Sequence, residues 1–341
     1  MMPSKRAALL VIMVIAVLSP ISNSDTSKIR VAVSYGMISA PIKDIGGDLI
    51  EVTELLPPSV EPHDYSLSPS LVSEASNSDI LVISGHLKWE LDLSQQVAAS
   101  KGIAEKDVTI DYLHGLYNEI KWLTLPNETG VNLHGFWYLP ENYLVIASTV
   151  KDRLTALRPE YSEYFEQNHE KLVKRIDALM LRINEISGDF QQYNRKVLIT
   201  SPEEQYLIAP FSLEVGESLV GSSEEITLSA SKMSAIITSL QTGRYSLVIT
   251  SDLSQLMKIF ESAREISAET GAPIVELTAI PNPSIDSLLM YNAGALMTGY
   301  LATGSVKANR LDALHYLLFA IIALLLGVAI LEYYLLGARR R

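Results

Sequence analysis

The sequence contains no cysteine. The chain therefore cannot form a disulfide framework, a zinc–thiolate site or an iron–sulfur cluster, and it cannot carry a lipid on a cysteine. It also lacks the H-E-x-x-H pattern of zinc proteases and the G-x-S-x-G turn of many hydrolases. A zinc hydrolase, which needs a general base and an open coordination position, is therefore a disfavoured alternative. Any metal site must use His, Asp, Glu or backbone oxygen.

Positive charge is scarce in the body of the chain. The formal net charge is −12, and residues 1–24 and 313–341 carry +2 each, so residues 25–312 carry −16. An acidic body argues against binding to nucleic acid, whose phosphates attract Lys and Arg. It is compatible with cation binding, although solubility alone explains such a charge equally well.

The first 24 residues are typical of a secretory signal peptide. Lys5 and Arg6 precede an apolar run over residues 7–18, and small residues then lead to Asp25. An N-terminal membrane anchor is the alternative interpretation of the same run.

A second apolar run occupies residues 313–331, which is long enough to cross a bilayer as a helix. Tyr333 and Tyr334 suit the membrane interface, and the arginines at 339–341 suit the cytoplasmic side. These features predict a cell-surface protein with one C-terminal transmembrane anchor and a cytoplasmic tail over residues 332–341.

Short apolar runs alternate with helical stretches between the two ends. We expect strands within residues 29–34, 49–56, 80–85, 196–201, 245–251 and 272–280, of which 49–56 alternates only weakly between apolar and polar residues. Residues 161–186 contain no Gly or Pro and keep apolar residues at helical spacing, which predicts a rod of about 40 Å. The pattern predicts an α/β fold of two lobes, each with a mostly parallel sheet flanked by helices, joined by one long rigid helix. The expected boundaries are 25–158 for a metal-binding lobe, 159–190 for the linking helix and 191–308 for the second lobe.

Three segments carry a resemblance to a known family. Residues 44–70 (DIGGDLIEVTELLPPSVEPHDYSLSPS), 132–160 (NLHGFWYLPENYLVIASTVKDRLTALRPE) and 268–277 (AETGAPIVEL) resemble the signatures of cluster A-I solute-binding proteins. That family serves zinc, manganese and iron ABC importers. The resemblance, which covers roughly residues 28–305, implies a non-enzymatic receptor that captures a divalent cation between two lobes and delivers it to an ABC permease.

The resemblance also implies ligands. His63 follows Pro62 in a proline-rich segment that restricts its backbone. His134 precedes an aromatic run that would exclude water around an ion. Both match metal-ligating histidines of the family, although an exposed turn and a packed histidine, respectively, are the structural alternatives. We interpret His86, His114, His169 and His315 as incidental.

The sequence departs from the family at the other two ligands. Pro202 stands where the family has its third metal ligand, and Glu203 follows it. Glu203, or else Glu204, is therefore the expected third ligand. A solvated helix start is an equally good interpretation of this acidic pair. No acid stands at the fourth position, near Thr278, which leaves Asp252, Glu276, Asp286 or a water.

Two imidazoles with a carboxylate suit Zn²⁺, Mn²⁺ or Fe²⁺, and a carboxylate in place of a third histidine slightly favours manganese or iron. Because the fourth acid is missing, a second function remains open, namely a relative that has lost metal binding and acts as a surface adhesin or interaction protein.

Overall fold

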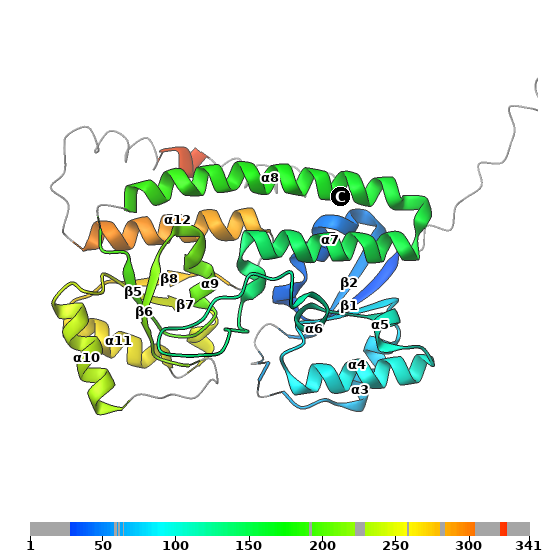
Figure 1. Ribbon diagram of the computed structural model, residues 1–341, viewed down its shortest axis with the longest axis horizontal. Helices are drawn as coiled ribbons and strands as arrows, with labels where there is room; N and C mark the ends of the chain where they lie inside the picture. The colour runs from blue at the N-terminus through cyan, green and yellow to red at the C-terminus, as the bar shows by residue number, and fades with distance from the viewer. Residues whose placement is uncertain are drawn as a thin grey trace, which may run out of the picture.

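The protein folds into two α/β lobes in the computed structural model, which describes residues 28–57, 60, 62–63, 65–190, 193–221, 229–257, 259–279, 284–303 and 321–325 (Figure 1). The first lobe holds a parallel sheet in the order β2-β1-β3-β4, and the second holds a parallel sheet in the order β6-β5-β7-β8. The two-lobe prediction is confirmed.

The first sheet comprises β1 (Ile29–Tyr35), β2 (Ile50–Leu56), β3 (Ile80–Ile83) and β4 (Thr109–Asp111); the second comprises β5 (Lys196–Ile199), β6 (Glu214–Ser218), β7 (Val248–Ser251) and β8 (Ile274–Leu277). Six of these strands coincide with the predicted apolar runs. The two that the sequence pattern missed, β4 and β6, are edge strands with polar and partly exposed residues, so they lack the apolar run by which the other strands were predicted.

Helices cover the sheets and connect their strands. The first lobe contains α2 (Ala40–Gly46), α3 (Pro69–Ser76), α4 (Lys88–Lys101), α5 (Glu105–Val108), α6 (Tyr112–Leu116) and α7 (Pro140–Leu157). The second contains α9 (Glu204–Ile208), α10 (Ala230–Gln241), α11 (Ile259–Thr270) and α12 (Ile285–Ala302). Short 3-10 turns include η3 (Phe136–Tyr138) and η7 (Ser254–Leu256). Ser68 caps α3 by accepting a hydrogen bond from the Leu71 N–H, with Pro69 at the first helical position.

The long helix predicted between the lobes is α8 (Ser162–Asp189), which runs along one side of both lobes (Figure 1). Its 28 residues give a length of about 42 Å at about 1.5 Å per residue. Its buried face is formed by Phe165, Leu172, Ile176, Leu179, Ile183 and Ile186. These side chains belong to one core cluster that includes residues of both sheets, so α8 packs against both lobes.

Arg175, midway along α8, also connects the lobes. Its guanidinium lies 2.9 Å from Asp44 of α2 and 2.8 Å from Asp286 of α12. Tyr143 of α7 donates a further hydrogen bond to Asp44, at 2.6 Å. The ion pairs therefore fix α2 and α12 against the same turn of α8.

The predicted signal peptide and transmembrane span lie mostly outside the residues that the structure describes. Residues 1–24 lie outside the described part, as does the predicted span 313–331 except for residues 321–325. Within the described part, no helix is both long enough and apolar enough to cross a bilayer. The transmembrane anchor therefore stays a prediction.

Candidate metal centre

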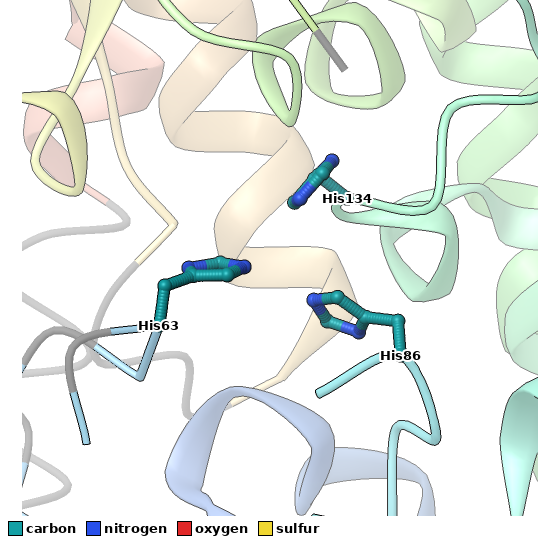
Figure 2. Close-up of side chains that lie close together, drawn as sticks. All are labelled: His63, His86 and His134. Atoms are coloured by element: carbon teal, nitrogen blue, oxygen red, sulfur yellow. The ribbon is translucent and has the colours of Figure 1, made fainter. Parts of the chain in front are cut away.

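Three histidines of the first lobe converge at the boundary between the lobes. The rings of His63, His86 and His134 approach one another in Figure 2, with centroids 5.2–5.4 Å apart. Each offers a ring nitrogen, and these three atoms all lie within 4.8 Å of one another. Imidazole nitrogen is a common ligand of divalent transition metals, so this cluster can hold a cation.

His63 lies on a loop that packs against α4 of the first lobe. Pro62 is buried, and its carbonyl accepts a hydrogen bond of 2.8 Å from the indole N–H of Trp89, on α4. The ring of Tyr65 packs edge-on against Trp89, with centroids 5.2 Å apart. His63 itself is exposed. These contacts with Trp89 hold the loop on both sides of His63, while the imidazole of His63 stays accessible to an entering ion.

His86 follows β3, and its ring orientation is set by a buried hydrogen-bond chain. Its Nδ1 lies 2.7 Å from Ser84 Oγ, and the Ser84 hydroxyl donates to Glu90 Oε2 at 2.6 Å. Because that hydroxyl proton goes to Glu90, Ser84 Oγ accepts the Nδ1–H of His86. The lone pair of the neutral ring is then on Nε2, and this nitrogen can bind a metal.

Glu90 is fully buried at the first turn of α4. Besides the hydroxyl, it accepts the backbone N–H groups of Ser84 at 2.9 Å and Gly85 at 3.0 Å. Burial raises the pKa of Glu90, and the hydrogen bonds from serine and backbone donors oppose that rise.

His134 lies on a loop that is tied to the second lobe. Its backbone N–H donates to the side chain of the buried Asn132, whose amide in turn donates to the Pro202 carbonyl at 2.8 Å and to Gln205 at 3.0 Å. Gly135 has φ +82°, and a Cβ there would lie 2.9 Å from Glu203 Cβ. The two lobes therefore approach closely beside His134, and the approach requires glycine.

Glu203, the predicted third ligand, lines the same cavity from the second lobe. Its carboxylate is buried and accepts hydrogen bonds from the hydroxyls of Ser201 and Ser251. Burial raises its pKa, while those hydroxyls and the nearby His134 lower it. Glu203 is not one of the three residues whose ligand atoms lie within 4.8 Å of each other.

Glu204 is fully buried behind Glu203 and does not line the cavity. It accepts hydrogen bonds from the backbone N–H and hydroxyl of Thr200, both at 2.7 Å. Burial and the neighbouring charge of Glu203 raise the pKa of Glu204 to about 8. The interpretation of this acidic pair as a solvated helix start is therefore wrong, because both carboxyl groups lie inside the second lobe.

The proposed fourth ligands lie elsewhere in the described structure, and none lines this cavity. Asp252 accepts hydrogen bonds from the Thr278 hydroxyl at 2.9 Å and from the Ala279 N–H at 2.8 Å. Asp286 pairs with Arg175, and Glu276 is exposed on β8.

The cavity between the lobes has a volume of about 60 Å³. One water needs roughly 10–15 Å³ by this measure, so the space accommodates a cation with waters. Its walls are mainly apolar, and they include Tyr35, Met37, Trp137, Val220, Leu253 and Met257. Such walls limit the access of solvent to a bound ion.

The sequence interpretation missed His86, which we expected to be incidental. A signal was present, because His86 comes soon after the buried strand β3, and ligands of open parallel sheets bind at the carboxyl ends of strands. His114 instead bonds Asp111 at 2.8 Å, His169 lies on α8, and His315 is outside the described residues.

Comparison with known proteins identifies the same architecture. A solved structure of a zinc-bound ZnuA deletion mutant superposes with a TM-score of 0.66 at 22% identity, covering 80% of this chain and 98% of the other. The Mn-bound periplasmic metal-binding protein of Candidatus Liberibacter asiaticus gives a TM-score of 0.61 at 18% identity, covering 80% and 99%. At these identities the likeness establishes the fold.

Sequence relatives agree with the structural ones. The metal ABC transporter substrate-binding lipoprotein SsaB of Streptococcus sanguinis is 25% identical over 183 residues, which are 53% of this chain and 58% of that protein. The chain thus spans a little over half the length of the relatives it matches in sequence. The family model described as "ZnuA: Zinc-uptake complex component A periplasmic" matches residues 31–297. The chain therefore belongs to this family of periplasmic solute-binding proteins, whose members bind solutes and are not enzymes.

Proposed function

We propose that the protein is an extracytoplasmic receptor that captures a divalent metal cation between its two lobes and delivers it to an ABC permease. Zinc and manganese are the leading cargo ions, and iron(II) is a further candidate. The observation that carries the proposal is the convergence of His63, His86 and His134 on one cavity that Glu203 closes from the second lobe.

The chemistry of the cavity supports this function. Imidazoles and a carboxylate are the ligand types that divalent transition metals take from proteins. The names of relatives point the same way, because SsaB is a metal ABC transporter substrate-binding lipoprotein and the solved structures include zinc-bound and Mn-bound forms. An adhesin that has lost metal binding is not favoured, since the three histidines remain together.

We also propose how the receptor is arranged on the cell. Residues 1–24 act as a signal peptide, 25–158 form the metal-binding lobe, 159–190 the linking helix, 191–308 the second lobe and 313–331 a transmembrane anchor. A chain ending near residue 309 should then leave the membrane fraction and stay folded. Retention of that truncated chain on membranes would place the anchor elsewhere.

The test of capture is the metal content of the protein purified without chelator. Mass spectrometry of the native full chain should find close to one zinc or manganese ion per molecule, and the same preparation should hydrolyse no generic ester or peptide substrate. A native protein that carries no metal and takes up none on titration would favour the interaction-protein alternative.

A further inference from the structure

We propose that His86 is a direct ligand of the captured cation, so that the three protein nitrogens come from the first lobe alone and select a nitrogen-preferring cation of the Zn²⁺ class over Mn²⁺. This inference rests on the proposed function and names the ligand set and cargo class of the same cavity.

The three ring nitrogens lie near the spacing that a single ion imposes on its ligands. Zinc–imidazole bonds are about 2.0–2.1 Å long, so two nitrogens on a tetrahedral ion lie about 3.4 Å apart. The ring nitrogens of His63, His86 and His134 lie within 4.8 Å of one another. Binding to one ion would therefore require these nitrogens to approach one another by up to about 1.4 Å, and His63 is the one exposed side chain of the three.

Ser84 and Glu90 form a hydrogen-bond chain that ends on the ring of His86. A metal-binding histidine commonly donates its other ring N–H to an oxygen that is itself held by a carboxylate or backbone group. Ser84 and the fully buried Glu90 supply such a pair, and they present Nε2 of His86 as the acceptor nitrogen. Glu90 also accepts the backbone N–H groups of Ser84, Gly85 and Leu87 at the start of α4, so its position is fixed and it can hold the Ser84 hydroxyl in turn.

The second lobe contributes a carboxylate to the wall of the cavity. Its carboxylate at the cavity, Glu203, is engaged by the hydroxyls of Ser201 and Ser251 and stands outside the three-histidine cluster. We place it beside the ion as a partner for charge and bound water. Three imidazoles without a primary carboxylate suit Zn²⁺, Ni²⁺ or Cu²⁺, whereas Mn²⁺ prefers oxygen ligands.

The test begins with the full chain in detergent, loaded with Zn²⁺ alone. X-ray absorption at the zinc edge should count three imidazoles in the wild type and two in His86→Ala. Competition against a chelator should show that His86→Ala weakens zinc binding by more than the roughly 10–100-fold that the loss of an outer-shell partner costs. Ser84→Ala should fall within that range, because it only orients the ring.

Two further variants complete the design. His114→Ala, a histidine of the same lobe outside the cavity, should leave zinc affinity unchanged. His86→Asp should narrow the preference for Zn²⁺ over Mn²⁺, because it replaces a nitrogen ligand with an oxygen ligand. If His86→Ala fails to fold, the imidazole count in the wild type still decides.

The outcomes separate the two proposals. Zinc bound with two imidazoles, or with unchanged affinity in His86→Ala, would overturn this inference and leave metal capture standing. A wider preference for Zn²⁺ in His86→Asp would also overturn it. A wild-type chain that binds neither Zn²⁺ nor Mn²⁺ would overturn both.

Discussion

Asn132 joins the loop that carries His134 to the second lobe, and its replacement by alanine should weaken both stability and metal binding. The side chain is fully buried and makes three hydrogen bonds, to the His134 N–H, the Pro202 carbonyl and Gln205. Each bond contributes about 1 kcal/mol, and buried partners left without a bond add to the cost, so Asn132→Ala should lose about 2–4 kcal/mol.

Thermal unfolding without metal measures this loss. In a chain of this size each 1 kcal/mol lowers Tm by about 2–4 °C, so we expect a decrease of roughly 5–15 °C. Zinc affinity should fall as well, because the His134 backbone loses its fixed position. The exposed Asn77 provides a matched control, and Asn77→Ala should change stability by less than about 0.5 kcal/mol. A loss below about 1 kcal/mol in Asn132→Ala would refute the reasoning.

Three other predictions follow from the same structure. The pKa of Glu204 is raised to about 8 from the usual 4.5, so between these pH values the folded state binds a proton that the unfolded state does not, and the stability of the wild type should fall as pH rises from 5 to 8. Thermal melts of Glu204→Gln should show a weaker dependence of stability on pH. Equal pH dependence in the two proteins would contradict the raised pKa of Glu204. Arg175→Met should lower the free energy of unfolding by about 1 kcal/mol, because it breaks partly exposed ion pairs to Asp44 and Asp286. High salt should reduce the difference between the denaturant midpoints of the wild type and this variant, because salt screens the ion pairs. Scattering profiles with and without zinc should nearly superimpose, because α8 packs against both lobes, and a large change in radius of gyration would refute this.

The sequence predicted the strands and helices whose burial requires a recognisable pattern of apolar residues. Strand β3 is buried at every position and appears as an unbroken apolar run, and the equally buried strand β7 begins with the apolar pair Val248 and Ile249. The polar edge strand β6 carries no such run, and it forms because β5 offers it a pairing edge. The long helix α8 was predictable because its core contacts recur at helical spacing.

The candidate site was predictable only where a motif marked it. His63 and His134 lie in segments that resemble family signatures, and the structure places both at the cavity. His86 carries no motif, and its place in the cluster depends on histidines from two other loops and on Glu90, six residues beyond Ser84. The burial of Glu203 and Glu204 was likewise invisible, because two adjacent acids after a strand are equally typical of an exposed helix start.

The central claim is that the histidine cavity captures one divalent cation, and calorimetric titration of Zn²⁺ into the metal-stripped full chain tests it most directly. We expect saturation at one ion per wild-type chain and no saturable binding in the His63→Ala, His134→Ala double variant. The bound ion should also stabilise the wild type by about 2.7 kcal/mol at a hundredfold excess over Kd. Binding that persists unchanged in the double variant, or a wild-type chain that binds no ion, would contradict the account.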